Sequence, residues 1–132
     1  MLQITINGEI HSSKNSRRVG RNKKTGKIFV SKSKSSKKDE GSFADQLAKQ
    51  TQAWQGMMMG QTYPIKLVFY FRRQTKRKFD YVNLAQGLLD ALVKAEFLPD
   101  DDADHVVPVF APYVLDKKNP GCDLTIFPGN IE

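Results

Sequence analysis

Residues 65–71 read IKLVFYF, and this apolar stretch decides the fold class because it fits a strand that is buried on both faces. Pro64 stands before it, where the missing N–H of a proline is tolerated at the start of a strand. Residues 2–7 alternate between apolar and polar side chains, as in a half-buried strand, and run into an Asn-Gly turn signal. The sequence therefore predicts a sheet with residues 65–71 in a central strand.

One helix is predicted before that strand in the sequence and another after it. Leu84, Leu88 and Leu92 form one apolar stripe, which predicts a helix that follows Asp80. Apolar residues at helical spacing predict an earlier helix over about residues 42–58. Further strands are predicted over residues 106–110 and 123–127. This order of elements predicts an α+β domain with a mixed or antiparallel sheet covered by two helices.

The length and composition limit the class of protein. The chain has 132 residues, the size of one domain, and 39% of them are hydrophobic, enough for a core. It has no apolar run near the roughly 20 residues of a membrane span, and its first residues do not read as a signal peptide. One cysteine, Cys122, excludes an intrachain disulfide and a cysteine-based zinc site. We therefore expect a single cytoplasmic domain over residues 1–132, without a membrane partner.

The charges are segregated along the chain. There are 21 Lys and Arg against 14 Asp and Glu, a net charge of +7, which favours a polyanionic partner. Residues 14–38 hold eleven basic side chains and no acidic one, and a second basic cluster follows residue 71. The candidate nucleic-acid contacts are Lys14, Arg17, Arg18, Arg21, Lys23, Lys24, Arg72, Arg73 and Lys76.

The basic segment 14–38 has turn residues at 24–27 between short apolar stretches, which predicts a mobile basic hairpin. Two interpretations of its charge stay open at this point, a solvated loop and a nucleic-acid contact.

Carboxylates gather in the second half of the chain, where seven of the 14 acidic residues lie between Asp80 and Asp104. Asp80 is also a good helix N-cap, and the run 100–104 could be a solvated loop. Mg²⁺ prefers oxygen ligands and is commonly held by one or two carboxylates with water and substrate phosphate. Such an ion polarises a phosphodiester and activates water, so aspartates next to cations are suited to DNA hydrolysis.

The segment 80–101 resembles the signature of the RusA family of Holliday-junction resolvases. It reads DYVNLAQGLLDAL, then KA and DD, against a family pattern of approximately D-x-D-N-x-x-K, D-A-L, K-A-G and D-D, in register and without a gap. The resemblance implies a RusA-like resolvase fold and a homodimeric, Mg²⁺-dependent endonuclease of DNA recombination and repair in phages or prophages. Its expected substrate is a four-way or branched DNA, and no small-molecule substrate is expected.

Residue by residue, the resemblance implies that Asp80 and Asp101 bind the metal and that Asp80, Asp90, Asp100 and Asp101 form the catalytic set. The chain has Val82 where the family has its second aspartate and Gln86 where the family has a catalytic lysine. The alternative is therefore a non-catalytic junction or nucleic-acid binding protein that kept the fold and lost part of the metal site.

Overall fold

The apolar stretch 65–71 lies in strand β4 (Ile65–Arg73) of the computed structural model. The structure describes residues 2–11, 17–21, 24, 28–32, 34–60 and 62–127. Ile65, Leu67 and Phe69 are completely buried on the face of β4 that the helices cover. Tyr70 lies on the other face and is exposed, so β4 is more one-sided than the continuous apolar run suggests.

The main sheet is mixed, which agrees with the predicted fold class. Its described strands are ordered β1-β7-β4-β5, and β1 (Leu2–Asn7) and β4 both pair antiparallel with β7 (Gly121–Phe127). β5 (Val106–Phe110) and the short β6 (Val114–Leu115) pair parallel with successive parts of β4. The four predicted strands are confirmed, and β7 begins two residues before the predicted start at 123. β6 was not predicted because two residues cannot show alternation.

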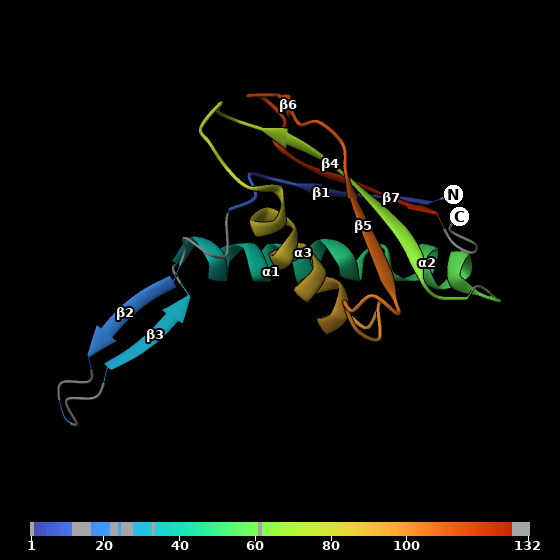
Figure 1. The fold of residues 1–132 in the computed structure, drawn as a ribbon, viewed down its shortest axis with the longest axis horizontal. Coiled ribbons are helices and arrows are strands. Elements are labelled where there is room, and N and C mark those ends of the chain that lie inside the picture. Colours follow the sequence, from blue (N-terminus) through green and yellow to red (C-terminus); the bar gives the residue numbers. More distant parts are fainter. Residues whose placement is uncertain are drawn as a thin grey trace.

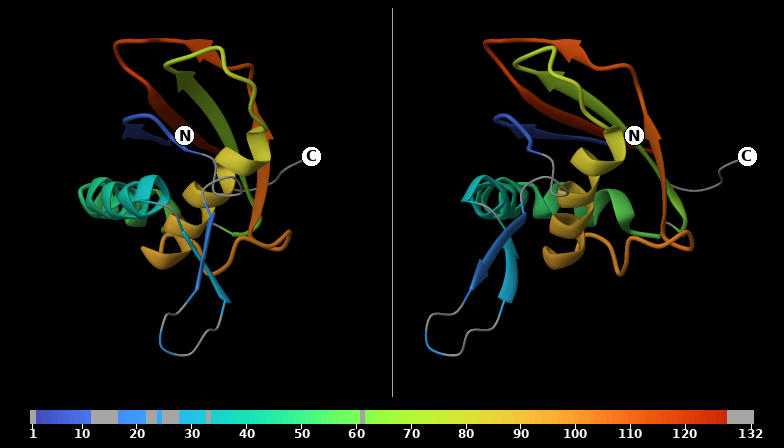
Figure 2. Two further views of the ribbon diagram at one scale, coloured as in Figure 1. Left: turned by 90° about the vertical axis from the view of Figure 1, so that its left-hand side faces the viewer. Right: turned by 60° about the vertical axis from the view of Figure 1, so that its left-hand side comes forward.

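The helices α1 (Lys34–Ala48), α2 (Thr51–Met58) and α3 (Tyr81–Lys94) lie on one face of the main sheet (Figures 1 and 2). The prediction of α3 is confirmed, and Leu84, Leu88 and Leu92 are buried as expected. The prediction of two covering helices is wrong, because the described residues form three. The expected single helix over 42–58 begins earlier, at Lys34, in polar sequence that carries no apolar period, and it is interrupted between Ala48 and Thr51.

The core lies between this helical layer and the sheet. Phe43 and Leu47 of α1 are buried there, together with Trp54 of α2, which stacks on Phe97 with ring centroids 5.0 Å apart. In the part of the chain that the structure describes, no helix is long and apolar enough to cross a membrane.

The basic segment contains the predicted hairpin. β2 (Arg17–Arg21) and β3 (Ile28–Lys32) pair antiparallel, with Val19 opposite Val30, and form a sheet of their own. The hairpin projects from the body of the domain near the start of α1 (Figures 1 and 2). Residues 34–38 belong to α1 and not to the hairpin, which corrects the predicted boundary. The predicted contacts Lys14 and Lys23 lie outside the described residues.

Candidate functional site

Asp80 directly precedes α3 and occupies its N-cap position with extended backbone angles, φ −109° and ψ 131°. Its side chain makes no capping hydrogen bond. Its carbonyl oxygen instead accepts hydrogen bonds from the backbone N–H groups of Asn83 and Leu84, and Asn83 Nδ2 donates to Asp80 Oδ2 at 3.3 Å. The carboxylate of Asp80 is therefore exposed at the start of the helix, held by an amide and open to a ligand.

A second group of carboxylates meets around Gln86. Gln86 Nε2 donates to Asp90 Oδ1 at 2.9 Å and to Asp101 Oδ2 at 3.4 Å. Asp100 Oδ1 accepts a hydrogen bond from the backbone N–H of Asp101 at 2.8 Å. The loop after α3 thus folds back along the helix and brings together Asp90, Asp100 and Asp101, which were predicted from sequence but could not be placed relative to one another.

The end of α3 explains this return. Glu96 has a left-handed backbone with φ 64°, and the backbone N–H groups of Phe97 and Leu98 donate to the carbonyl oxygen of Leu92. Phe97 and Leu98 are only 2% and 1% exposed. Their burial anchors the chain under the helix, so the acidic run starts beside α3 with Asp100, Asp102 and Asp104 exposed.

The carboxylates along α3 form two groups. Asp80 and Asp90 are separated by ten residues, which at a rise of about 1.5 Å per residue corresponds to about 15 Å along the helix axis. Mg²⁺ binds oxygen at about 2.1 Å, so these two carboxylates cannot ligate the same ion. Among the described residues, no group of three or more His, Cys, Asp or Glu side chains is arranged to hold a metal ion.

A cleft of about 590 Å³ opens beside Asp80. Asp80, Asn83 and Leu84 contribute to one part of its wall, and the basic segment after β4 contributes another part that includes Arg77 and Lys78. The full lining is Glu9, Ile10, His11, Arg73, Gln74, Thr75, Arg77, Lys78, Phe79, Asp80, Asn83 and Leu84. A carboxylate that can bind a metal thus shares one cleft with side chains that can neutralise phosphate.

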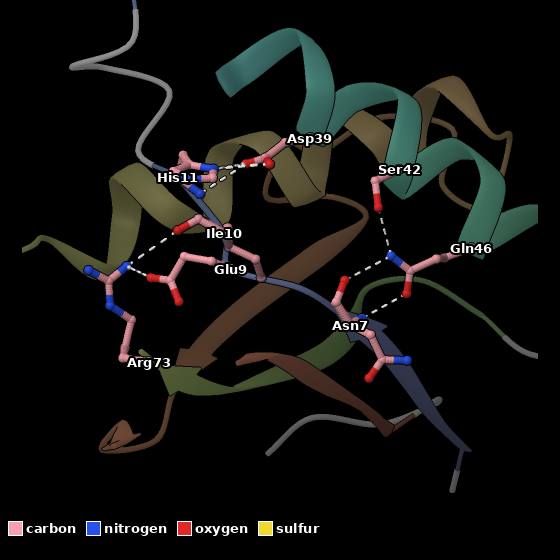
Figure 3. Close-up of polar contacts among 8 residues, drawn as sticks. All are labelled: Asn7, Glu9, Ile10, His11, Asp39, Ser42, Gln46 and Arg73. Carbon is pink, nitrogen blue, oxygen red and sulfur yellow. Dashed lines mark hydrogen bonds and ion pairs between the residues drawn. The ribbon is translucent and has the colours of Figure 1, made fainter. Parts of the chain in front are cut away.

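Arg73 lines this cleft with a side chain that is almost completely buried. Its Nη1 lies 3.2 Å from Glu9 Oε1 and donates to the carbonyl oxygen of Ile10 at 3.3 Å (Figure 3). Its guanidinium also lies over the ring of Phe79, 4.4 Å from the centroid. Arg73 is 8% exposed. This arginine, predicted as a DNA contact, is used inside the protein to join the end of β4 to residues 9 and 10.

Arg72 lies on the opposite face of β4 because side chains alternate along a strand. Its Nη1 donates to both carboxylate oxygens of Asp123, at 3.1 and 3.2 Å. Lys76, in contrast, is exposed in the segment after β4, as are Arg77 and Lys78. Of the basic cluster after residue 71, the exposed residues 76–78 are therefore better placed to meet a polyanion than the two ion-paired arginines.

Glu9 and His11 are cleft residues that the sequence did not single out. His11 Nδ1 lies 3.0 and 3.1 Å from the two oxygens of Asp39, and the His11 backbone N–H donates to Asp39 Oδ2 at 2.9 Å (Figure 3). Asp39 belongs to α1, so this pair fixes the chain where it leaves the body toward the hairpin. Glu9 and His11 could not be predicted as cleft residues, because each is a single polar residue outside any periodic pattern or motif.

Val82 and Gln86, the two residues that differ from the RusA pattern, both lie in α3. Val82 is 63% exposed in the first turn, so an aspartate there would meet solvent and not the core. Gln86 stands at the lysine position and makes the two carboxylate contacts described above. The departures therefore change the chemistry of an accessible surface and leave the packing of the helix intact.

Cysteine chemistry does not contribute to this site. Cys122 is buried in β7, and this burial raises the pKa of its thiol far above the ordinary value. The thiol therefore stays protonated at neutral pH and is a poor nucleophile.

Comparison with known proteins gives no assignment for the chain: no protein-family model and no curated protein matches it.

Proposed function

We propose that this protein is a Mg²⁺-dependent endonuclease that cuts four-way or branched DNA, a RusA-like junction resolvase. The observation that carries the proposal is the cleft in which the exposed Asp80 carboxylate lies with Arg77 and Lys78. A carboxylate beside a phosphate-binding surface repels the phosphate unless a cation lies between them, so the combination favours a metal-dependent reaction over simple DNA binding. The resemblance of residues 80–101 to the RusA signature supports the same class.

In this proposal Asp80 and Asp101, which belong to the two separate carboxylate groups along α3, are each metal ligands. Their donor atoms are the carboxylate oxygens that Mg²⁺ prefers. Because one or two carboxylates with water and substrate phosphate can hold this ion, each of the two groups can bind a metal of its own. The bound ion would polarise the scissile phosphodiester and lower the pKa of a water molecule.

The remaining side chains would position these groups. Asn83 orients the Asp80 carboxylate, and Gln86 orients Asp101 through a shared contact with Asp90. Exposed cations of residues 76–78 would neutralise the phosphates on either side of the reacting one. Since a four-way junction has approximate two-fold symmetry, paired nicks require two sites, and we propose that a homodimer supplies them.

A second candidate, a junction-binding protein without catalysis, is favoured by one specific observation. Val82 occupies the position of the family's second aspartate, and the described residues contain no group of three ligands for a metal. Such a protein would keep the basic hairpin and the cleft but would bind the junction without cutting it.

A cleavage assay separates the two candidates. With a labelled synthetic four-way junction, a linear duplex of the same sequence and Mg²⁺, we expect paired nicks in the junction and little cutting of the duplex. Ca²⁺ in place of Mg²⁺ serves as a control that supports binding without efficient hydrolysis. Tight junction binding without nicks over a wide range of Mg²⁺ would support the second candidate, and equal affinity for junction and duplex would contradict both.

The basic hairpin should determine part of the salt dependence of junction binding. Replacing Arg17, Arg18, Lys23 and Lys24 with alanine should flatten the dependence of log Kd on log salt concentration, by about 0.9 for each duplex phosphate that the hairpin no longer neutralises. Junction affinity is measured by fluorescence anisotropy at several salt concentrations. The variant Lys117→Ala with Lys118→Ala removes exposed charge from the turn before β7 and should leave the slope nearly unchanged. An unaltered slope in the hairpin variant would show that the hairpin does not bind DNA.

A further inference from the structure

The free edge of β1 is occupied by two glutamine side chains. β1 pairs with β7 on one side and lies at the end of the main sheet among the described strands, so the backbone groups on its other side lack a strand partner. Gln46, on α1, accepts from the backbone N–H of Asn7 at 2.7 Å and donates to its carbonyl oxygen at 3.0 Å (Figure 3). Gln50 makes the same pair of contacts with Thr5, both at 3.3 Å.

Each carboxamide therefore does what a neighbouring peptide group does in an antiparallel ladder, giving and accepting one hydrogen bond at every second residue. The remaining amide donor is also used: Gln46 Nε2 donates to Ser42 Oγ at 2.9 Å, and Gln50 Nε2 donates to the carbonyl oxygen of Gln46 at 3.1 Å. These additional bonds fix both side chains in the orientation that meets the strand. Gln46 and Gln50 form a pair that we call the amide cover.

Apart from α1 and its amide cover, the sequence of β1 carries none of the residues that usually protect an edge strand against pairing. β1 reads LQITIN, without a charged residue or a proline, and four of its six residues are β-branched or leucine. Exposed edges are usually protected by lysine, proline or a bulge, and an uncharged stretch of this kind is suited to strand addition. A second copy of β1 can pair with it antiparallel, because two uncharged strands meet no like charge and a two-fold axis at Thr5 places Gln3 of one copy opposite Asn7 of the other.

We propose that the amide cover keeps the β1 edge closed and that the edge, once uncovered, pairs with β1 of a second copy of this chain. The inference rests on the backbone contacts of Thr5 and Asn7 and is independent of the proposed nuclease function. The amide cover acts as a built-in substitute for a strand, and it holds α1 against the sheet edge at the same time.

The test replaces both amides with methionine, which has nearly the same size and no hydrogen-bonding groups. We expect Gln46→Met with Gln50→Met to self-associate on the order of tenfold or more beyond the native chain, since it gains several backbone hydrogen bonds between copies. Sedimentation velocity over a range of concentrations measures the association. Hydrogen exchange should show faster exchange at the Thr5 and Asn7 amides in dilute solution and renewed protection as concentration rises.

Two further variants make the result specific. Gln52→Met with Gln55→Met makes the same change at exposed positions of α2 and should not alter association. Gln46→Glu with Gln50→Glu removes the same amide donors but places negative charge at the edge, so it should expose the carbonyl groups without promoting pairing. The proposal is overturned if the doubly substituted Gln46→Met, Gln50→Met chain keeps the native mass at all concentrations, if the α2 variant or the glutamate variant associates equally, or if association leaves β1 unprotected.

Discussion

Asp101→Asn and Asp80→Asn should each lower the rate of junction cleavage by at least about a hundredfold, because a bound metal contributes several kcal/mol to the transition state. Asparagine keeps the size of the side chain and removes the charge that the metal needs. Junction affinity without metal should stay the same or increase, since a negative charge near phosphate has been removed. Single-turnover cleavage and anisotropy binding measure the two effects separately.

Asp104→Asn is the matched control for this experiment, because it removes one exposed carboxylate from the same acidic run. It should cleave at the native rate. The side chain of Asp80 makes no capping hydrogen bond, so Asp80→Asn should keep the native circular dichroism spectrum. If the Asp80 and Asp101 variants cut as fast as the native protein, these residues do not hold the catalytic metal.

Arg73→Met should lower the free energy of unfolding by about 3 kcal/mol. Removing one partner of a buried ion pair costs about 3–5 kcal/mol, and the lower end applies because Glu9 keeps some contact with water and with the backbone N–H of Gln74. The variant also loses the hydrogen bond to the carbonyl oxygen of Ile10. Urea denaturation followed by tryptophan fluorescence, with Trp54 as the probe, measures the change.

Arg77→Met removes an exposed arginine from the same cleft and should leave the urea midpoint almost unchanged. Adding Glu9→Gln to Arg73→Met should restore part of the lost stability, because the unpaired carboxylate is then neutral. An Arg73 variant with native stability and weakened junction binding would instead assign this arginine to the DNA surface.

The fold was predicted from sequence where local patterns decide the structure. The continuous apolar run 65–71 and the leucine stripe after Asp80 are each a pattern within one short segment, and such a pattern survives in any topology that buries the segment. The interruption of the helix at residues 49–50 has no such local pattern, because Gln50 is held by a hydrogen bond to Thr5 of β1, 45 residues away in sequence. Strand order was not predictable for the same reason, since it is set by contacts between distant segments.

The candidate site divides in the same way. The aspartates were predicted as site residues because their spacing matches a known pattern. The contact between Gln86 and Asp101 explains how residues fifteen positions apart come together. The use of Arg72 and Arg73 inside the protein could not be found, because a basic cluster reads the same whether its charges face DNA or a carboxylate. Only the alternation of β4 sends one arginine to Asp123 and the next to Glu9.

The position of β7 between β1 and β4 has a consequence for synthesis on the ribosome. β1 and β4 emerge first, but the strand that joins them is the last described strand of the chain. At about 5–20 residues per second, the apolar run 65–71 waits several seconds for β7. During that time the sheet lacks an interior strand, β7, and not an edge strand. The domain must therefore complete its fold after residues 121–127 have left the exit tunnel, because β7 is the pairing partner of both β1 and β4.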